Sequence, residues 1–575
     1  MIQKGLPMKT YNNLRPVEPA KPVTDLRSMM ESTAQIYGER PVFIYRENGE
    51  KKQLTYNEFW EDIRAFGTGL YQYGLAGKRI AVVGDTHPAW LTAFIATIST
   101  GGVIVPLDKE LDGDQMVEFL KIAECSALVY TASMAKRIDA LRKDLAFLDY
   151  LIPAVAEEGD ADVLPLGAVI AKGQEALEGG DTAFMDLVPD TDAMASIMFT
   201  SGTSGTSKGV VLSHKNFVAS INASCDCTQY DKDDVLVAVL PIHHAYELIC
   251  GELSAYNMGI TICICDGLRY ASRNFKEYNP TALILVPLFL ETVHKKIWDE
   301  IKKKKMEKKV RAAMALSNSL LKVGVDLRPK FFREITSAFG ENLKSIIVGG
   351  APIDPGILSD FYSFGITVQQ GYGITECSPL VACNRAGRIK FHSVGEPVLG
   401  CEVKIDPLPE STKGEGEILV KGDNVMPGYY KNDEANRAVF TEDGWFRTGD
   451  VGTVDKDGFV TITGRLKNVI IASNGKNVYP EELEEKLLRV PAVRECVVLG
   501  REEASGEVVI TAIIVPNYDV LGEGTTDTAA SFILKEAIAQ VNRTLPPYKH
   551  INHFEVRHED FEKTPSKKIK RFLVK

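Results

Sequence analysis

The first two hundred residues alternate between helical and strand patterns of apolar positions. Thr55 and Glu58 form a capping box that predicts the start of a helix, and apolar residues then recur at helical spacing as far as Leu70. Short apolar runs between such helices predict buried strands at Ile80–Val83, Val103–Val105, Ala127–Tyr130 and Tyr150–Ala154. Helices that alternate with short apolar strands are typical of parallel sheets covered on both faces. The pattern predicts an α/β fold with parallel-rich sheets flanked by helices.

The pattern changes near Gly464. A short strand is expected over 469–472, a helix from Pro480, two strands near 496–499 and 508–515, and a helix over 529–542. Strands and helices of this kind predict a small α+β domain. We therefore expect an N-terminal domain over 1–464, with a helical insertion at about 293–340, and a C-terminal domain over 465–575.

Length and charge narrow the class of protein. A chain of 575 residues buries enough surface to fold without a disulfide or metal staple. Its formal charge of −11 argues against a general nucleic-acid binder, which would carry a basic domain or stripe. The last 34 residues, from Asn542, are basic, with nine Lys or Arg against four Asp or Glu. Such a tail is usually a solvated surface, but it also suits a domain that meets phosphates.

Cysteine usage and the N-terminus point to a reduced, cytosolic chain. The ten cysteines include no CxxC pair, although Cys263 and Cys265 are expected on one face of a buried strand. The opening MIQKGLPMKTYNNLRP has no apolar core of the kind found in secretory signals. The uncharged stretch 90–107 is interrupted by Gly101, Gly102 and Pro106, so we expect a buried helix and strand rather than a membrane span.

The strongest chemical signal is the segment FTSGTSGTSKGVVLSH, from Phe199 to His214. It follows an apolar strand pattern and gathers Ser, Thr and Gly ahead of Lys208, so its amides, hydroxyls and ammonium suit a polyphosphate. A flexible Gly/Ser linker is the alternative interpretation. Gly209 follows Lys208 where a Walker A loop needs Ser or Thr, which excludes a P-loop kinase or ATPase.

This segment resembles the phosphate loop TSGTTGxPKG of the adenylate-forming enzymes, which include acyl-CoA synthetases, peptide-synthetase adenylation domains and firefly luciferase. The one departure is Ser207 in place of the usual proline. Further family motifs follow in the family's order, from about residue 25 to the chain's end. They are Gly349-Gly350-Ala351-Pro352 at the adenine, GYGITE at Gly371–Glu376, RTGD at Arg447–Asp450, the hinge Gly464-Arg465-Leu466-Lys467 and the lysine motif EKTPSKKIKR.

The resemblance implies a nucleotide site. Glu376 and the Thr200 hydroxyl would bind Mg²⁺, a hard cation that takes oxygen ligands, with Thr375 beside them. Asp450 would accept hydrogen bonds from the ribose hydroxyls, with Arg465 nearby. The remaining ATP- or AMP-binding residues that it implies are Ser201, Gly202, Thr203, Ser204, Gly205, Lys208, Gly350, Ala351, Pro352, Gly371, Tyr372 and Gly373.

The resemblance also implies residues for catalysis and for the thiol. His244 in LPIHHAYE would stand beside the acyl carboxylate, with His243 as the competing candidate. Lys568 aligns with the family's catalytic lysine, although Lys567 stands where glycine is usual. Asn474 and Gly475 would approach the coenzyme A channel, where a missing side chain leaves room for the pantetheine arm.

The family's reaction has two steps, between which the small domain rotates about a hinge at Lys467. A carboxylate and ATP give an acyl adenylate and pyrophosphate, and a thiol then attacks the adenylate. Coenzyme A is the expected acceptor, and a separate acyl carrier protein is the alternative. A non-catalytic acyl- or nucleotide-binding relative is the alternative from a different class of protein.

The class of acid that is activated is indicated by the long connection between Pro287 and Gly349, which lie 62 positions apart. Long-chain fatty acyl-CoA ligases resemble this chain in carrying an extra helical segment here, whereas small-acid and aryl-acid ligases are similar to each other in having a shorter connection. Ligation of a bile acid or an aryl acid to coenzyme A is the third option. Within it, 295–311 holds nine basic and three acidic residues, with acid-first i,i+4 pairs that support one helix. A solvated helix face is one interpretation, and attraction to an anionic membrane is the other.

Together these observations predict an AMP-forming long-chain fatty acid–CoA ligase. Its expected substrates are a fatty acid, ATP and coenzyme A, its expected cofactor is Mg²⁺, and no nucleic acid is expected as a partner. We expect it in the cytoplasm, with peripheral attachment at the inner membrane surface as a further hypothesis.

Overall fold

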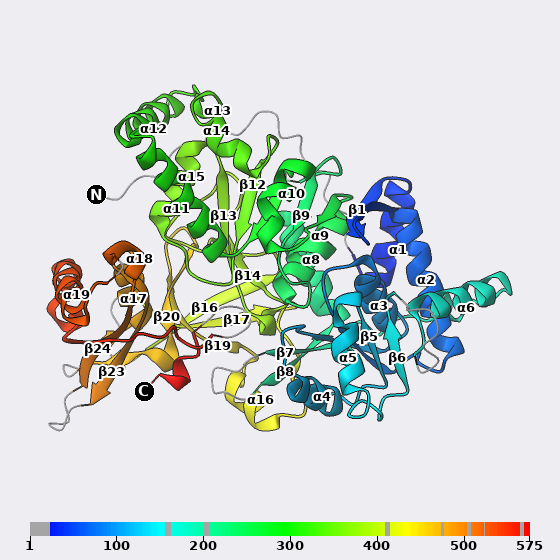
Figure 1. Ribbon diagram of the computed structural model, residues 1–575. Coiled ribbons are helices and arrows are strands. Elements are labelled where there is room, and N and C mark those ends of the chain that lie inside the picture. The colour runs from blue at the N-terminus through cyan, green and yellow to red at the C-terminus, as the bar shows by residue number, and fades with distance from the viewer. Residues whose placement is uncertain are drawn as a thin grey trace. The chain divides into compact units, whose positions relative to one another are not determined.

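The computed structural model describes residues 23–155, 163–200, 207–228, 230–408, 414–472, 476–502, 508–522, 524–563 and 569–574. The chain forms two compact units (Figure 1). Unit 1 comprises 1–200, 208–402 and 422–436, and unit 2 comprises 201–207, 403–421 and 437–575, with the last division inside α16 (Asp433–Val439). The proposed boundary at 464/465, at the hinge motif, stays a prediction.

The first sheet of unit 1 has seven strands in the order β18-β8-β7-β4-β3-β5-β6. Its parallel part runs from β7 to β6, and β8 and β18 add antiparallel strands at the other edge. The strands are β3 (Arg79–Val83), β4 (Val103–Leu107), β5 (Ala127–Tyr130), β6 (Tyr150–Pro153), β7 (Met194–Thr200), β8 (Lys208–Ser213) and β18 (Gly428–Tyr429). The four strands expected from the apolar runs therefore all lie side by side in one sheet.

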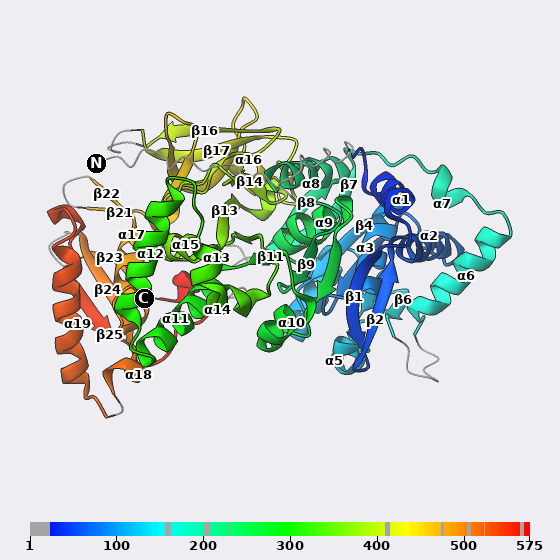
Figure 2. The same ribbon diagram turned by 90° about the horizontal axis from the view of Figure 1, so that it is seen from above.

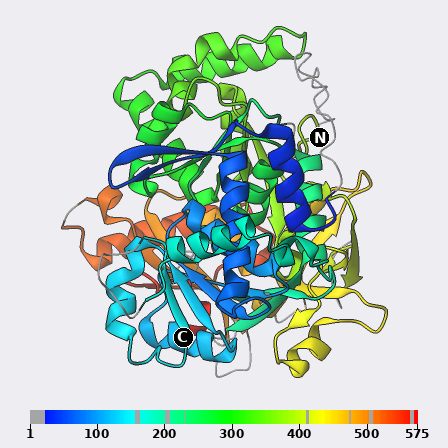
Figure 3. The ribbon, with the colours of Figure 1, turned by 90° about the vertical axis from the view of Figure 1, so that its right-hand side faces the viewer.

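Helices surround this sheet, as the alternating pattern predicts. The helix after Thr55 is α2, whose N-terminus carries the expected capping box with Glu58. Figure 3 shows the N-terminal helices and the hairpin of β1 and β2 in dark blue. The helices are α1 (Leu26–Tyr37), α2 (Tyr56–Gln72), α3 (Pro88–Ser99), α4 (Gly113–Ile122), α5 (Ala135–Leu141), α6 (Leu166–Glu178) and α7 (Ala183–Asp186).

The second sheet of unit 1 has nine strands in the order β15-β14-β13-β12-β11-β9-β10-β1-β2, and β13 to β1 are parallel neighbours. Cys265 lies one residue beyond the end of β10, and it packs against the same hydrophobic cluster as Cys263, as expected of two residues on one face. The strands are β1 (Pro41–Glu47), β2 (Glu50–Thr55), β9 (Val235–Ala238), β10 (Thr261–Ile264), β11 (Ala282–Leu285), β12 (Ser345–Val348), β13 (Thr367–Gly373), β14 (Leu380–Cys383) and β15 (Glu396–Pro397).

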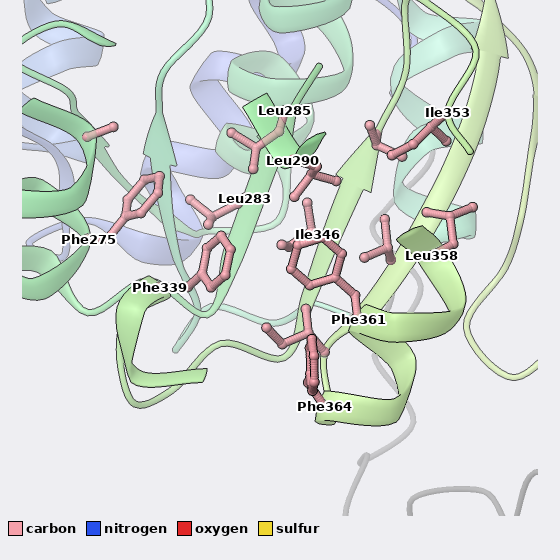
Figure 4. Packing of buried hydrophobic residues seen from close by; sticks show 14 of the residues in the cluster. Phe275, Leu283, Leu285, Leu290, Phe339, Ile346, Ile353, Leu358, Phe361 and Phe364 are labelled. Carbon is pink, nitrogen blue, oxygen red and sulfur yellow. The ribbon is translucent and has the colours of Figure 1, made fainter. Parts of the chain in front are cut away.

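One face of this sheet carries an aromatic core. Leu283 and Leu285 of β11 point into it, together with Phe275, Phe339 and Phe361 from the covering helices (Figure 4). The helices beside this sheet are α8 (His214–Cys227), the π-helix η2 (Tyr246–Leu253), α9 (Ser254–Asn257), α10 (Ala271–Tyr278), α11 (Pro287–Lys303) and α15 (Pro355–Phe364), several of them visible in Figure 2.

The connection between β11 and β12 is helical, but it contains more than one helix. After α11 come α12 (Glu307–Leu321), α13 (Arg328–Phe331) and α14 (Arg333–Thr336). The single helix expected over 295–311 is wrong, because Lys305 adopts φ 55° and ends the helical path. Of the expected pairs, Glu307 contacts Arg311 at 3.1 Å, whereas Lys304 instead reaches Glu334 at 2.7 Å.

Unit 2 contains three small sheets. The four-stranded sheet has the order β16-β17-β19-β20, and the three-stranded sheet β23-β24-β25 carries α17 and α19 on one face. The short strand expected over 469–472 is confined to β21. The elements are β16 (Cys401–Pro407), β17 (Gly416–Gly422), β19 (Phe446–Val454), β20 (Val460–Arg465), β21 (Ile470–Ile471), β22 (Asn477–Val478), α17 (Pro480–Leu488), β23 (Val493–Glu502), β24 (Val508–Pro516), α18 (Tyr518–Leu521), α19 (Asp527–Asn542) and β25 (His553–Val556).

The described residues contain no helix that is both long and apolar enough to span a bilayer. All ten cysteines lie within the described ranges, and none is in a disulfide.

Candidate active site

The hairpin of β7 and β8 holds the two ends of the expected phosphate loop. Thr200 at the end of β7 is the register partner of Lys208 at the start of β8, and its hydroxyl lies 3.4 Å from the Lys208 carbonyl oxygen. The loop residues Ser201, Gly202, Thr203, Ser204 and Gly205 lie outside the described residues. The strand pairing therefore places the two flanking residues of the motif side by side.

Tyr429 connects Lys208 with Glu376. Its hydroxyl donates a hydrogen bond to Oε1 of Glu376 at 2.8 Å, and the Lys208 ammonium lies 4.7 Å from the centre of its ring. Burial, and then the charge of Glu376, raise the pKa of Tyr429, so its hydroxyl stays protonated and remains a donor. β18 brings Tyr429 to this place because it pairs with β8. A cation, an aromatic ring and a carboxylate thus lie in a row in unit 1.

The turn after β13 fixes Glu376. A Cβ on Gly373 would lie 2.0 Å from the carbonyl oxygen of Pro379, so this position accepts only glycine. Glu376 stands in the short 3₁₀ turn Thr375–Cys377, and its carbonyl oxygen accepts a hydrogen bond from the Met426 amide at 2.8 Å. Thr375 and Glu376 are therefore held by backbone contacts before any ligand binds.

Glu376 in this turn and Thr200 at the end of β7 carry donor groups that suit Mg²⁺. Glu376 offers a carboxylate and Thr200 a hydroxyl, and hard oxygen donors of this kind, few in number, are what Mg²⁺ takes when phosphates complete its shell. Tyr429 orients the carboxylate in the way that outer-shell partners orient a metal ligand. In the described part of the chain, no group of three or more His, Cys, Asp or Glu side chains could hold a metal by itself.

The two glycine motifs meet at the carboxyl ends of β12 and β13. A Cβ on Gly349 would lie 3.4 Å from the Gly371 carbonyl oxygen and 3.2 Å from the Tyr246 ring. The next residues along the chain, Gly350, Ala351 and Pro352, are exposed beyond β12. Tyr372 lies on β13 and is buried, with only 8% of its surface exposed, so most of its ring packs inside the protein. Its contact with adenine stays a prediction.

The two histidines follow β9 and differ in their surroundings. Nε2 of His243 lies 3.5 Å from a carboxylate oxygen of Asp108, the residue after β4. Burial acts to raise the pKa of Asp108, but the His243 contact outweighs it and the pKa is lowered. The rings of His243 and His244 lie 4.2 Å apart, and the His244 ring is partly exposed. His243 is therefore paired with Asp108, and His244 remains the candidate for contact with the acyl carboxylate.

In unit 2, Asp450 and Arg465 contact each other. They are register partners on β19 and β20, and Nε of Arg465 lies 2.7 Å from Oδ1 of Asp450. Asp450 is buried, with 4% of its surface exposed. The guanidinium orients this carboxylate, which suits the hydrogen bonds that a ribose diol would donate.

Glu417 secures the rest of the RTGD motif. Its carboxylate accepts hydrogen bonds from the Arg447 guanidinium at 2.6 Å and from the Gly449 amide at 3.1 Å. Arg447 also contacts Asp406 at 3.1 Å. Arg447 of this motif therefore holds the turn in place, and Asp450 remains the candidate residue of this motif for binding a ligand.

The hinge motif packs against α17. Asn468 donates a hydrogen bond to Glu481 at 2.6 Å, and a Cβ on Gly464 would lie 2.9 Å from both Glu481 and Tyr479. Lys467 follows β20, and partial burial, together with the nearby Arg465 and Arg571, lowers its pKa. A hinge role for Lys467 stays a prediction.

The expected catalytic lysine and thiol-channel residues lie outside the described residues. These are Lys568, with its neighbour Lys567, and Asn474 with Gly475. The residues that flank the lysine motif are anchored: Lys563 contacts Glu495, and Arg571 contacts Glu484 of α17. Burial raises the pKa of Glu484 to about 7, while Arg571 acts in the opposite direction.

Three of these residues were not found from the sequence: Tyr429, Glu417 and Glu484. Each is an ordinary surface-like residue in sequence, and its role depends on a strand or helix that is distant in the chain. The run PGYYKN around Tyr429 was the available signal, since two aromatic residues after a Pro-Gly turn mark a short buried strand.

Comparisons with known proteins find relatives that cover most of the chain. The chain is 28% identical over 579 residues to the long-chain-fatty-acid–[acyl-carrier-protein] ligase AEE15 of Arabidopsis thaliana, covering 88% of this chain and 78% of that protein. It is 28% identical over 564 residues to the long-chain-fatty-acid–CoA ligase FadD15 of Mycobacterium bovis, covering 92% and 91%. The crystal structure of ATP-bound MatB from Rhodopseudomonas palustris has the same fold, with a TM-score of 0.73, 22% identity, and coverage of 96% and 98%.

Family models match both parts of the chain. The model of AMP-binding enzymes matches residues 30–430, and that of the AMP-binding enzyme C-terminal domain matches residues 482–568. The first match alone spans more than half of the chain and contains the Lys208, Tyr429 and Glu376 row. The chain therefore belongs to the AMP-binding enzyme family.

Proposed function

We propose that this chain is an AMP-forming acid–thiol ligase that activates a long-chain fatty acid and transfers it to coenzyme A. The observation that carries the proposal is the row of Lys208, Tyr429 and Glu376, in which Lys208 begins the strand that follows the phosphate-loop motif. Lys208 supplies positive charge for the phosphates, and Glu376 supplies a carboxylate for the metal that accompanies ATP. The two curated relatives described above are named as ligases of long-chain fatty acids, which supports the same class of acid.

The first step needs positioning and charge neutralisation. A carboxylate oxygen of the acid attacks the α-phosphorus of ATP, and the bond from this phosphorus to pyrophosphate breaks. Lys208 and the loop amides would bind the phosphate oxygens. Glu376 and Thr200 would hold Mg²⁺, which would neutralise part of the developing charge. His244 lies beside the acyl carboxylate, and Asp450 holds the ribose.

The second step transfers the acyl group. The sulfur of the thiol attacks the carbonyl carbon of the adenylate, the bond from this carbon to the AMP oxygen breaks, and AMP leaves. We assign Lys568 to the first step and the segment of Asn474 and Gly475 to the second. Both assignments come from the family motifs.

The helical connection between β11 and β12 supports a long-chain acid. It holds α11 to α14, and α11 is fixed to α15 because His294 and Trp298 both reach Asp360, at 2.9 and 3.0 Å. Ligases of aryl or bile acids are the alternative within the class.

A basic surface on this connection supports peripheral attachment to an anionic membrane. Lys302–Lys305, Lys308 and Lys309 are exposed, and exposed apolar residues stand among and after them: Met306, Leu316, Val323, Val325 and Phe331. Lysines beside exposed apolar side chains are typical of helices that lie in the membrane interface. A cytoplasmic location stays a prediction.

Pyrophosphate release tests the proposed function. The purified chain is given Mg·ATP and a panel of saturated, aryl and bile acids, and we expect release to be fastest with long-chain acids. Absence of release with every acid would indicate a binding protein instead. Repeating the panel with coenzyme A and with purified acyl carrier protein identifies the acceptor, because only the true thiol gives a thioester.

A further inference from the structure

Two buried carboxyl groups on one helix have no hydrogen-bond partner. Glu247 and Glu252 lie on the π-helix η2, and each has 1% of its surface exposed. Among the described residues, none of their four carboxyl oxygens forms a hydrogen bond. Burial raises the pKa of Glu252 to about 8, and burial together with the nearby Glu252 raises the pKa of Glu247 well above its ordinary value. Buried polar groups are rarely left unpaired, and π-helical turns are frequent at functional sites.

The helix η2 leads from the nucleotide motif to a cavity. Its first residue, Tyr246, lies against Gly349. Further along, Cys250 and Gly251 line a cavity of about 10 Å³, room for one water-sized group. Its other walls include Ala255, Met258, Ala282 and Ile284. The cavity is therefore mostly apolar and begins within two turns of the nucleotide motif.

The strands beside η2 show in which direction the cavity lies from the nucleotide motif. Ala282 and Ile284 alternate with Leu283 and Leu285, so they face away from the aromatic core in Figure 4. Gly349 follows the carboxyl end of β12, whereas Ala282 is the first residue of the neighbouring strand β11. Ala282 is the register partner of Ser345, four residues before Gly349, so the cavity reaches about 13 Å from the nucleotide motif, at about 3.3 Å per strand residue. An acyl chain with its carboxylate at the motif would extend in this direction.

Glu247 points at the space beside the cavity. Gly251 has no side chain, and a Cβ there would lie 3.4 Å from the carboxyl carbon of Glu247 and 3.5 Å from the terminal methyl of Ile284. The carboxyl group of Glu247 therefore lies beside Gly251, which is one of the residues that line the cavity. The backbone amides of Val239 and Leu240 act to lower the pKa of Glu247, but burial and the nearby Glu252 outweigh them.

We propose that Glu247 is a specificity residue that selects acids carrying a hydroxyl or keto oxygen along the chain, an inference that rests on the proposed ligase function. A plain alkyl chain passing Gly251 would leave the carboxyl group of Glu247 unpaired. A hydroxyl or keto oxygen of the chain at this place would accept a hydrogen bond from the O–H of the Glu247 carboxyl group. A chain hydroxyl would also be able to donate a hydrogen bond to the carbonyl oxygen of that group. Sites with buried polar groups discriminate strongly against ligands that leave those groups unpaired.

The test compares matched acids on the intact enzyme. The acids are a long-chain saturated acid and its isomers with a hydroxyl near the carboxylate, at mid-chain or at the terminal carbon. Pyrophosphate release gives kcat/KM, and titration of each acid gives its affinity without turnover. In the wild type we expect at least one hydroxylated isomer to exceed the plain acid by about tenfold or more in both measurements.

Three variants separate the explanations. Glu247→Leu should remove the preference for the hydroxylated acid, and Glu247→Gln, which keeps the shape and a hydrogen-bonding group, should keep most of it. Glu252→Leu is the matched control, because it changes an equally buried carboxyl group on the same helix and should leave the preference unchanged. Thermal unfolding shows that each variant is folded.

Each outcome has a defined meaning. If the plain acid reacts and binds as well as every isomer, and Glu247→Leu leaves this ratio unchanged, the carboxyl group contacts only a buried water and the inference is wrong. Equal loss of the preference in Glu252→Leu also overturns it, since general disruption of η2 then explains the effect. Absence of pyrophosphate with all acids rejects the ligase function, and the titrations still decide whether Glu247 recognises the hydroxyl.

Discussion

The Tyr429 hydroxyl donates a hydrogen bond to Glu376 at 2.8 Å, across 53 positions of the chain. The same ring lies 4.7 Å from the Lys208 ammonium, so one aromatic side chain joins the proposed metal ligand to the proposed phosphate ligand. Its place on β18, paired with β8, makes this contact part of the first sheet rather than of a separate loop.

Tyr429→Phe keeps the ring under Lys208 and removes the hydrogen bond to Glu376. We expect pyrophosphate release to need a higher magnesium concentration, by about 10- to 100-fold, as for the loss of an outer-shell partner. A magnesium titration of adenylation measures this shift. Tyr430→Phe is the control, because Tyr430 contacts Glu124 instead. Equal magnesium dependence in both variants would show that the hydrogen bond plays no part.

Glu376→Gln keeps the size of the side chain but replaces a carboxylate by a weaker ligand. We expect adenylation to fall by more than in Tyr429→Phe, mainly through poorer use of Mg·ATP. The measurement is pyrophosphate release across a magnesium titration. A wild-type response would remove Glu376 from the site.

Lys568→Ala should reduce adenylate formation by about 10²–10³, or ~3–4 kcal/mol, as for the loss of one charge-stabilising donor. It should largely spare thioester formation from supplied acyl adenylate. A bulky residue at Gly475 should do the reverse, because it obstructs the thiol. Lys567→Ala is the control for charge, and a larger adenylation defect in this variant would place the catalytic lysine one position earlier.

Substituting Lys302, Lys303, Lys308 and Lys309 with Gln tests the membrane surface. Each lysine contributes about 1 kcal/mol near an anionic bilayer, so binding should weaken by roughly 10³-fold. Cosedimentation with phosphatidylserine vesicles measures this effect, and Gln at Lys51 and Lys52 of β2 is the control. Unchanged binding, or a change equal to that of the control, would leave these lysines as a solvated face. If the substitutions weakened binding to an acidic carrier protein more than binding to the vesicles, the lysines would bind a protein partner instead.

Glu252→Gln should alter the pH dependence of stability. The folded pKa of Glu252 is about 8 against 4.5 in the unfolded chain, so the folded state binds the extra proton between these values. The unfolding free energy therefore falls as pH rises through this window, by up to about 1.4 kcal/mol per pH unit. Denaturant unfolding across this range should give a shallower slope for Glu252→Gln. Identical slopes would mean that Glu252 has a normal pKa.

The sequence predicted the local elements well where one face of each is buried. The Thr55–Glu58 capping box and the strands β3 to β6 are local patterns, since capping bonds and apolar runs depend on neighbours a few residues apart. The break at Lys305 could not be predicted, because the acid-first pairs of this region favour one continuous helix. There a tertiary contact, from Lys304 to Glu334, replaces the local pair.

The sequence by itself determined the family, because the phosphate loop, GYGITE and RTGD are contiguous segments whose chemistry depends on residue types and spacing. Only the tertiary structure decided that Tyr429 joins Lys208 to Glu376, that Glu417 holds Arg447, and that Glu247 is buried beside Gly251 without a partner. The physical reason is that hydrogen bonding and desolvation act over a few ångströms in space. Strand order sets which side chains come that close, and it is fixed by packing of the whole sheet rather than by any one segment.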